Sequence, residues 1–135
     1  MLSIPLAKQL RSAGLQWRPR KFDFFHIPDR DLDDRLFVVA DFSIDVQRLA
    51  DGIAAITFNG AVEWSLDYIL QQDVVWLPTE AQLRDLIGDR FRGLVAAGDG
   101  WEVLVADGDR VDRHRADTPA NAYASALLAQ LSTSS

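Results

Sequence analysis

The densest group of side chains with chemical potential lies in a nine-residue segment that holds four aspartates and two arginines. Asp29, Asp31 and Asp33 have the alternate spacing with which an EF-hand calcium loop begins, so they are weak candidates for metal ligands. An EF-hand also requires glycine at its sixth position and glutamate at its twelfth. Asp34 and Ala40 occupy those two positions, so the segment is not an EF-hand.

A hydrophobic strand that leads into Asp-x-Asp is also typical of phosphatases in which one carboxylate attacks phosphorus and the other handles a proton. Asp29 and Asp31, together with His26, are therefore the candidates for a small metal-dependent hydrolase. Such enzymes need magnesium, a cation to offset the phosphate charge and a parallel sheet, and both lysines of this chain precede the motif. The alternative is a solvated hairpin tip in which Arg30 and Arg35 neutralise the aspartates.

The two histidines, His26 and His114, are far apart in sequence and fall on different predicted strands. A catalytic triad would need a serine on a tight turn, and Gly-x-Ser-x-Gly does not occur. His26 alternates with Phe22 and Phe24, which predicts a half-buried strand residue rather than a base. His114 lies between two arginines and is predicted to be exposed.

Several classes of cofactor chemistry are excluded by the sequence, and no cofactor is expected. The absence of cysteine rules out thiol catalysis, iron–sulfur clusters, cysteine-bound zinc and disulfides. Neither Gly-x-Gly-x-x-Gly nor a P-loop is present. The segment around Asn59, Gly60 and Glu63 predicts a junction between a strand and a helix, where free amides would hold an anion or small ligand. The alternative is an ordinary turn that uses Gly60 for backbone freedom.

Four tryptophans occur in 135 residues. Trp76 and Trp101 fall on predicted strand faces and are expected in the core. Trp17 lies in a basic loop and Trp64 at the edge of a predicted helix. If both are exposed and adjacent, they form a patch for protein interaction, since tryptophan is enriched among interface anchors. The alternative for both is ordinary packing.

The net charge of −6 is unevenly distributed. Residues 1–21 contain five basic residues and no acidic one, which leaves the rest of the chain at −11. An acidic body disfavours nucleic acid, because phosphate binding needs a cationic field. No segment approaches the roughly 20 apolar residues of a membrane helix, and basic residues interrupt the N-terminal apolar run. We therefore expect no nucleic-acid partner, no membrane insertion and a cytoplasmic location.

The hydrophobic pattern predicts an α+β fold, with helices packed on an antiparallel-rich mixed sheet in two layers. We expect a single domain over residues 1–131, followed by a frayed tail at 132–135. The predicted helices are 4–13, 43–50, 61–70, 79–91 and one that begins at Pro119; for 43–50 the alternative is an alternating strand. The predicted strands are 22–27, 36–40, 53–58, 74–77 and a three-strand meander over 91–115.

Residues 12–17, 25–39, 58–69 and 76–83 together resemble a group of short, uncharacterised bacterial proteins that sometimes carry the label pilus-assembly protein. The resemblance covers most of the chain, and its motifs are structural in character. Residues 117–129, which follow a predicted hairpin, are also similar to the closing strand–helix unit of a small phage-derived sandwich domain. That second resemblance covers about a quarter of the chain and implies an origin in a mobile element.

No catalytic constellation is complete in the sequence. The leading hypothesis is therefore a non-catalytic interaction or accessory domain, which binds another protein or forms a homodimer through a sheet edge or the tryptophan patch. The alternatives are the metal-dependent hydrolase at Asp29 and Asp31, and the ligand-binding module at Gly60.

Overall fold

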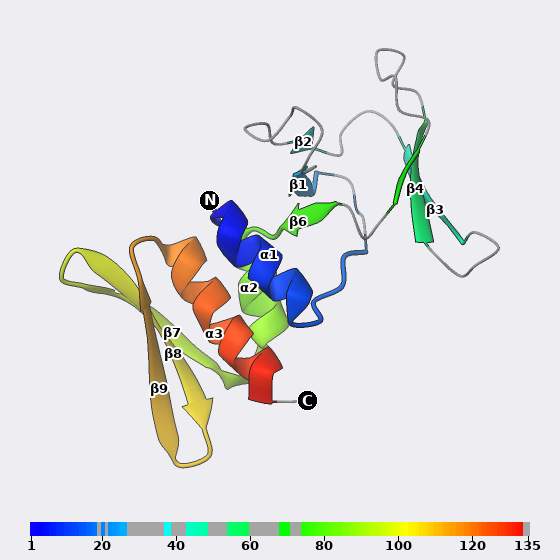
Figure 1. Cartoon of the computed structure of the whole chain (residues 1–135). Coiled ribbons are helices and arrows are strands. Elements are labelled where there is room, and N and C mark those ends of the chain that lie inside the picture. The colour runs from blue at the N-terminus through cyan, green and yellow to red at the C-terminus, as the bar shows by residue number, and fades with distance from the viewer. Residues whose placement is uncertain are drawn as a thin grey trace. The chain divides into compact units, whose positions relative to one another are not determined.

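The computed structural model describes residues 1–18, 20, 22–26, 37–38, 43–48, 54–59, 68–70 and 74–133, and the chain is α+β as the sequence predicts (Figure 1). The chain divides into two compact units. Unit 1 comprises Met1–Gln16 and Leu77–Ser135, and unit 2 comprises Trp17–Trp76. The expected single domain over residues 1–131 stays a prediction, since two compact units can belong to one domain.

The sheet of unit 1 is the predicted meander of three antiparallel strands: β7 (Phe91–Ala97), β8 (Gly100–Asp107) and β9 (Arg110–Ala116). Two-residue turns, Gly98-Asp99 and Gly108-Asp109, connect the strands. Gly98 and Gly108 have φ of 60° and 61°, and the following aspartates do not have positive φ. Glycine at the first turn position is the mark of the type II′ hairpin turn, which matches the twist of the strands.

The helices of unit 1 are α1 (Ile4–Ser12), α2 (Glu80–Ile87) with a 3₁₀ turn η2 (Gly88–Arg90), and α3 (Pro119–Thr133). Each of the three α-helices has a terminus at which the sequence carries a capping motif. Thr79 and Gln82 form a capping box at the start of α2, and the Thr118 hydroxyl accepts from the Asn121 amide at 3.2 Å to cap α3. At the end of α1 the amides of Gly14 and Leu15 donate to the carbonyl oxygens of Arg11 and Leu10, which is a Schellman motif.

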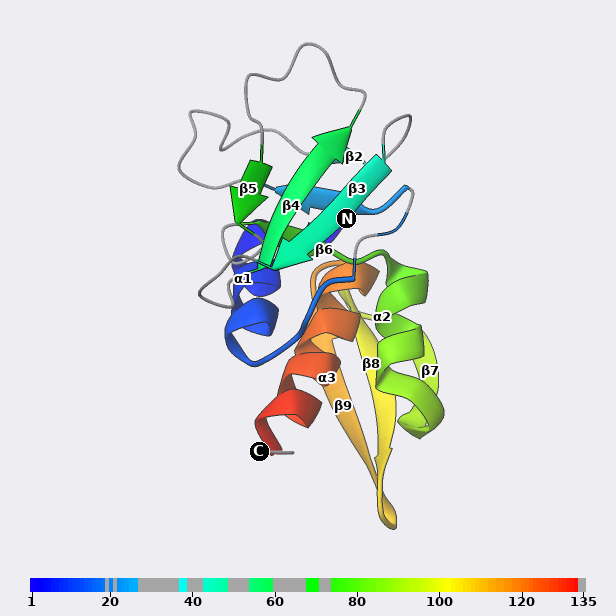
Figure 2. The same cartoon turned by 90° about the vertical axis from the view of Figure 1, so that its right-hand side faces the viewer.

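The central element of unit 1 is α3, which contacts α1, α2, β8 and β9 (Figure 2). A helix with neighbours on several sides is apolar all round. This explains why α3 buries residues around most of its circumference: Ala120, Ala122, Tyr123, Ala124, Ala126 and Leu127. The helix continues to Thr133, two residues into the segment expected to fray.

The described residues of unit 2 form short strands in two three-stranded sheets with the orders β2-β1-β6 and β3-β4-β5, and the last residue of β6, Leu77, is the point at which the chain returns to unit 1. The first sheet contains β1 (Phe24–His26), β2 (Phe37–Val38) and β6 (Val75–Leu77). β1 and β2 pair antiparallel, as the sequence predicts. The second sheet contains β3 (Ser43–Arg48), β4 (Ala54–Asn59) and β5 (Tyr68–Leu70), with β4 paired antiparallel to both neighbours.

The helix predicted at 43–50 is wrong, and so is the end of the helix predicted at 61–70, because pairing with β4 overrides local spacing; residues 61–67 lie outside the described residues. Residues 43–48 are strand β3, the alternative that alternation offers, and residues 68–70 are strand β5 rather than the end of a helix. Two boundaries also differ. β1 begins at Phe24 instead of Phe22, and α2 ends at Ile87, so that Phe91 opens β7 instead of ending the helix.

Candidate functional site

Most residues predicted to do chemistry lie outside the described part of the chain. This applies to Asp29, Asp31, Asp33, Gly60, Glu63 and Trp64. Asn59 is the last residue of β4, one residue beyond the end of the predicted strand. The hydrolase and ligand-site hypotheses that depend on these residues therefore stay predictions.

His26 and Trp17 belong to the described residues, and both are buried. His26 is 2% exposed on β1, which is more than the half-burial that alternation predicts. Trp17 is 6% exposed, its ring centroid lies 5.5 Å from that of Phe25, and its Nε1 donates to Asp23 Oδ2 at 2.9 Å. Trp17 therefore does not supply the exposed ring that the tryptophan-patch hypothesis requires.

Two absences hold for the described residues. Among them, no group of three or more histidine, aspartate or glutamate side chains could hold a metal ion. No helix in this part of the chain combines the length and the apolar character needed to cross a lipid bilayer. Neither statement extends to Asp29, Asp31 and Asp33.

The β7–β8–β9 sheet has one face toward α3 and one face away from the helices of unit 1 (Figure 1). The covered face includes Val103 and Val105, both buried, and Phe91, whose ring centroid lies 5.7 Å from that of Tyr123 on α3. Successive residues of a strand point to opposite faces, and directly paired residues share a face. The register of β7 against β8 shifts between Phe91 and Gly93, and beyond that irregularity alternate residues of the sheet belong to the other face, which we call the open face.

The open face is apolar along β7 and β8. Its positions on these two strands are Gly93, Val95, Ala97, Gly100, Glu102, Leu104 and Ala106. Glu102 is the one charged residue among these seven. On β9 the open face adds Val111, Arg113 and Arg115. Val95 and Val111 are 39% and 54% exposed, so apolar surface reaches solvent on both edge strands.

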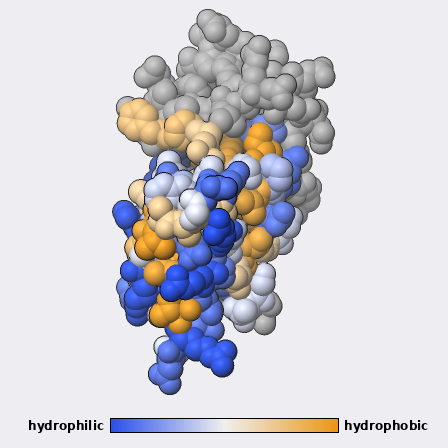
Figure 3. Space-filling view, turned by 90° about the vertical axis from the view of Figure 1, so that its left-hand side faces the viewer, coloured by the Kyte–Doolittle hydropathy of each residue, from blue (hydrophilic) through white to orange (hydrophobic). Residues whose placement is uncertain are grey.

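The charges of the open face are concentrated on β9. Arg115 is directly opposite Glu102, and Arg113 Nη1 lies 3.1 Å from Glu102 Oε2. The side chain of Arg113 is 66% exposed and that of Glu102 only 17%. Two arginines thus face one carboxylate that is itself largely covered, and the edge of the open face along β9 is cationic. Figure 3 shows this side of unit 1, with apolar side chains gathered between charged ones.

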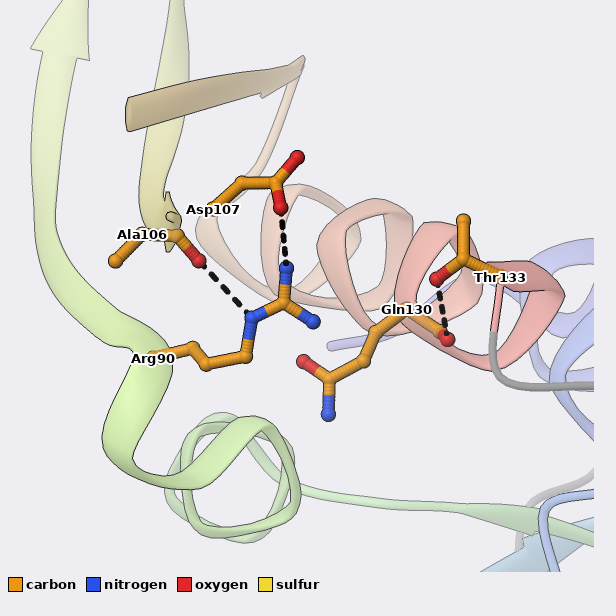
Figure 4. A network of polar contacts seen from close by, with 5 residues as sticks. All are labelled: Arg90, Ala106, Asp107, Gln130 and Thr133. Atoms are coloured by element: carbon orange, nitrogen blue, oxygen red, sulfur yellow. Dashed lines mark hydrogen bonds and ion pairs between the residues drawn. The ribbon is translucent and has the colours of Figure 1, made fainter. Parts of the chain in front are cut away.

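Polar contacts fix the start of β7 to the end of β8 (Figure 4). Arg90 Nε donates to the carbonyl oxygen of Ala106 at 2.9 Å, and Arg90 Nη2 lies 3.8 Å from Asp107 Oδ1. At the other end of the sheet, a Cβ added to Gly100 would lie 2.5 Å from the carbonyl oxygen of Ala116. The sheet is therefore fixed at one end by the contacts of Arg90 and closely packed at the other end, where Gly100 approaches the backbone of Ala116.

A second unusual feature is the turn at Phe22 in unit 2. The amide of Asp23 donates to the carbonyl of Arg20 at 3.1 Å, and Phe22 has φ of 74°. This left-handed backbone normally belongs to glycine or asparagine at the third position of a turn, and costs another residue about 1–2 kcal/mol. The buried Asp23 carboxylate holds the turn, since its Oδ2 accepts from Trp17 Nε1 and from the Arg20 amide at 3.0 Å.

Sequence reasoning missed both features. The open face has a visible signal, because Gly93, Val95 and Ala97 alternate on β7 without a polar residue. By itself that alternation predicts a strand of the meander and not which of its faces is left uncovered. The Phe22 turn has no such signal, because the pattern of Phe22 and Phe24 is that of an ordinary strand.

No family model, no curated protein and no solved structure matches the chain. The resemblance to the short bacterial proteins labelled pilus-assembly protein therefore stays a prediction.

Proposed function

We propose that the chain is a non-catalytic protein-interaction domain that binds a partner on the open face of the β7–β8–β9 sheet. The observation that supports this function is the composition of that face. Six of its seven positions on β7 and β8 carry no charge, although no helix of unit 1 covers them.

The composition is unusual for a face in contact with water. Antiparallel sheets with one solvated face normally alternate between apolar residues inside and polar residues outside. In β8 both faces are largely apolar, with Val103 and Val105 inside and Leu104 and Ala106 outside. Covering such a surface contributes about 25 cal/mol for each Å² of apolar area removed from water. A partner that covers the open face would therefore gain affinity from β7 and β8.

Charge indicates the chemistry of the partner. Arg113 and Arg115 border the apolar strip and only Glu102 opposes them, so the best partner presents carboxylates beside apolar side chains. A second copy would present the same two arginines and only one largely covered carboxylate, so it would not supply the acidic groups that this face favours. The proposal is therefore a segment of another protein with apolar and acidic residues side by side, and not a symmetric dimer through this face.

A random library of 16-residue peptides displayed on phage tests the function even though the partner is unidentified. The bait is the full chain, and Arg113→Glu serves as the counter-bait. We expect enrichment of peptides that combine apolar with acidic residues, with affinity for Arg113→Glu lower by about tenfold or more. Raising the salt concentration should weaken binding, because the exposed charges are screened.

Arg84→Glu is the matched control, because Arg84 is exposed on α2, away from the sheet. Peptides that bind Arg113→Glu as well as the unaltered chain would overturn the assignment to the open face. No enrichment, or a dimer in light scattering that Arg113→Glu dissolves, would overturn the proposed partner.

A further inference from the structure

The two outer strands of the β7–β8–β9 sheet differ in how their edges are protected. Among the described residues, β8 is the one strand paired with β7, and β9 lies on the far side of β8 (Figure 2). From Arg110 to Arg115, β9 carries a charged side chain or histidine at every position except Val111. From Gly93 to Ala97, β7 carries none. Charged residues normally keep the free backbone groups of an edge strand from pairing with another chain, so the β7 edge lacks this protection.

The free backbone groups of this edge belong to Leu94 and Ala96. Ala97 and Gly100 flank a two-residue turn and form a hydrogen-bonded pair, and such pairs alternate along an antiparallel ladder with pairs that are not hydrogen-bonded. Leu94 and Ala96 fall at the second kind of position, so their amides and carbonyls point away from β8. Beyond the ladder with β8, residues 93–97 form no hydrogen bond with the described residues, and Ala96 is exposed. A further strand can therefore reach this edge.

Opposite charges lie at the two ends of the unprotected stretch. Arg92 precedes it and Asp99 follows it, and both are exposed. Neither forms an ion pair with a described residue, and the Arg92 guanidinium donates to the backbone carbonyls of Asp89 and Phe91. A strand that matches this edge is therefore apolar in the middle, acidic where it meets Arg92 and basic where it meets Asp99. β7 itself has that pattern when it runs in the antiparallel direction.

We infer that two copies of the chain pair antiparallel through their β7 edges and form one continuous six-stranded sheet. In the register that uses all the outward backbone groups, Val95 lies on the two-fold axis opposite Val95 of the second copy, and Leu94 of each copy pairs with Ala96 of the other. Arg92 of each copy then lies beside the Asp99 turn of the other copy, whereas parallel pairing would bring like charges together. The inference does not depend on the proposed function, because the edge and the open face are different surfaces.

Side-chain packing supports this arrangement. Val95 is 39% exposed, and in this register it faces its symmetry mate at a position without ladder hydrogen bonds, where side chains approach most closely. Pairs of β-branched residues at such positions stabilise a sheet. The two β9 strands, with Arg113 and Arg115, would lie at opposite edges of the six-stranded sheet, about 24 Å apart. That distance exceeds the screening length of about 8 Å, so their charges do not oppose the dimer.

Sedimentation velocity of the full chain tests the inference. We expect a concentration-dependent dimer between about 10 μM and about 1 mM, as for a small interface. Arg92→Glu and Asp99→Lys should each raise the dissociation constant at least about tenfold, because each places like charges together at both ends of the paired stretch. An equimolar mixture of these two variants should dimerise as strongly as the unaltered chain, because every end contact then joins opposite charges. Arg84→Glu, exposed on α2, is the matched control, and it should leave the dimer intact, as should Arg113→Glu.

An introduced cysteine tests the register, since the chain contains none. Val95→Cys places two thiols opposite each other within reach of a disulfide, so the oxidant diamide should link the two copies. Val111→Cys is the control, because Val111 is more exposed, at 54%, but lies on β9. A chain that stays monomeric at about 1 mM would overturn the inference. So would equal cross-linking at positions 95 and 111, or a mixture of the two charge variants that dimerises no better than either alone.

Discussion

Units 1 and 2 differ in net charge, in backbone geometry and in the kind of surface that is unusual in each. Unit 1 has eight basic and nine acidic residues, and among its described residues only glycines have a positive φ. Its unusual surface is a regular sheet face with an apolar composition. Unit 2 has eleven acidic residues against six basic ones, and its unusual surface is a single strained turn that displays an aromatic ring.

The difference shows two physical routes to an unusual surface. In unit 1 the described backbone follows local preferences, so the surface arises only from which side chains occupy alternate positions. In unit 2 Phe22 has a positive φ, which phenylalanine rarely adopts. The hydrogen bonds of Asp23 hold the turn in that conformation. Substitutions in unit 1 should therefore act through packing, whereas in the Phe22 turn they should act through one buried carboxylate.

The largest expected effect follows from Asp23→Ala. This change removes the acceptor of two hydrogen bonds and leaves the Trp17 indole N–H buried, so the free energy of unfolding should fall by about 3 kcal/mol. Asp23→Asn keeps one acceptor oxygen and should lose less. Urea denaturation gives the magnitude, and hydrogen exchange should show lost protection between Trp17 and Phe25.

Asp85→Ala is the control, because Asp85 is exposed on α2 and its loss should change stability by less than about 0.5 kcal/mol. Equal stabilities of Asp23→Ala and Asp85→Ala would show that the buried carboxylate does not hold the turn. The expected difference between the two units, that the Phe22 turn depends on one buried carboxylate, would then be wrong.

The next largest effect is expected from Gly100→Ala in unit 1. The added Cβ would lie 2.5 Å from the backbone oxygen of Ala116, and a backbone atom cannot move aside without shifting β9. We expect a loss of about 2 kcal/mol, as for other overpacked sites. Gly93→Ala on the same face is the control, since its Cβ meets nothing within 4 Å and should be neutral or stabilising. Equal effects of the two variants would contradict a close approach at Gly100.

The difference between the two units also explains which parts of the fold could be predicted from the sequence. In unit 1 the signals are local: Thr79 and Gln82 three residues apart, Pro119 directly after Thr118, and glycines at two-residue turns. These chemistries determine a helix end or a hairpin whatever the rest of the chain does. The α+β class, the meander and the three helices of unit 1 follow from them.

In unit 2 the decisive interactions are non-local. Residues 43–48 and 68–70 have helical spacing or ambiguous patterns, and they become strands because β4 pairs with both. Of the candidate site residues, His26 and Trp17 are correctly predicted in a strand and a loop, but their burial depends on packing that spacing does not show. The open face and the strained φ of Phe22 depend on register and on Asp23, which no single segment reveals.

A smaller effect is expected from Asn121→Ala, which tests how α1 is tied to α3 within unit 1. Asn121 Oδ1 accepts from the Ser3 amide at 2.9 Å, and Asn121 Nδ2 donates to Asp117 Oδ1 at 3.1 Å. Loss of these bonds should cost about 1 kcal/mol and lower the melting temperature by about 4 °C. Hydrogen exchange at the Ser3 amide should accelerate. Ser132→Ala, at an exposed helix end, should leave both readouts unchanged; an identical response would rule out a specific tie.

The smallest effect concerns one buried polar atom in each unit. Among the described residues, Gln130 Oε1 in unit 1 and Trp76 Nε1 in unit 2 are buried without a hydrogen-bond partner. Gln130 lies on α3 near Arg90, while its own backbone carbonyl accepts from the Thr133 hydroxyl at 3.0 Å (Figure 4). Gln130→Met keeps the length of the side chain and removes the unsatisfied acceptor, so unit 1 should gain about 0.5–1 kcal/mol.

Gln9→Met on the exposed side of α1 is the matched control and should leave stability unchanged. A gain in the free energy of unfolding for Gln130→Met, without a gain for Gln9→Met, would show that unit 1 buries a polar group that does not stabilise it. Asp23 in the Phe22 turn is expected to do the opposite. A loss of stability in Gln130→Met would mean that water hydrogen-bonds to the side-chain amide of Gln130, and that the polar contacts around Arg90 extend to α3. In that case unit 1 would also depend on a buried polar contact, and the contrast with unit 2 would be one of degree.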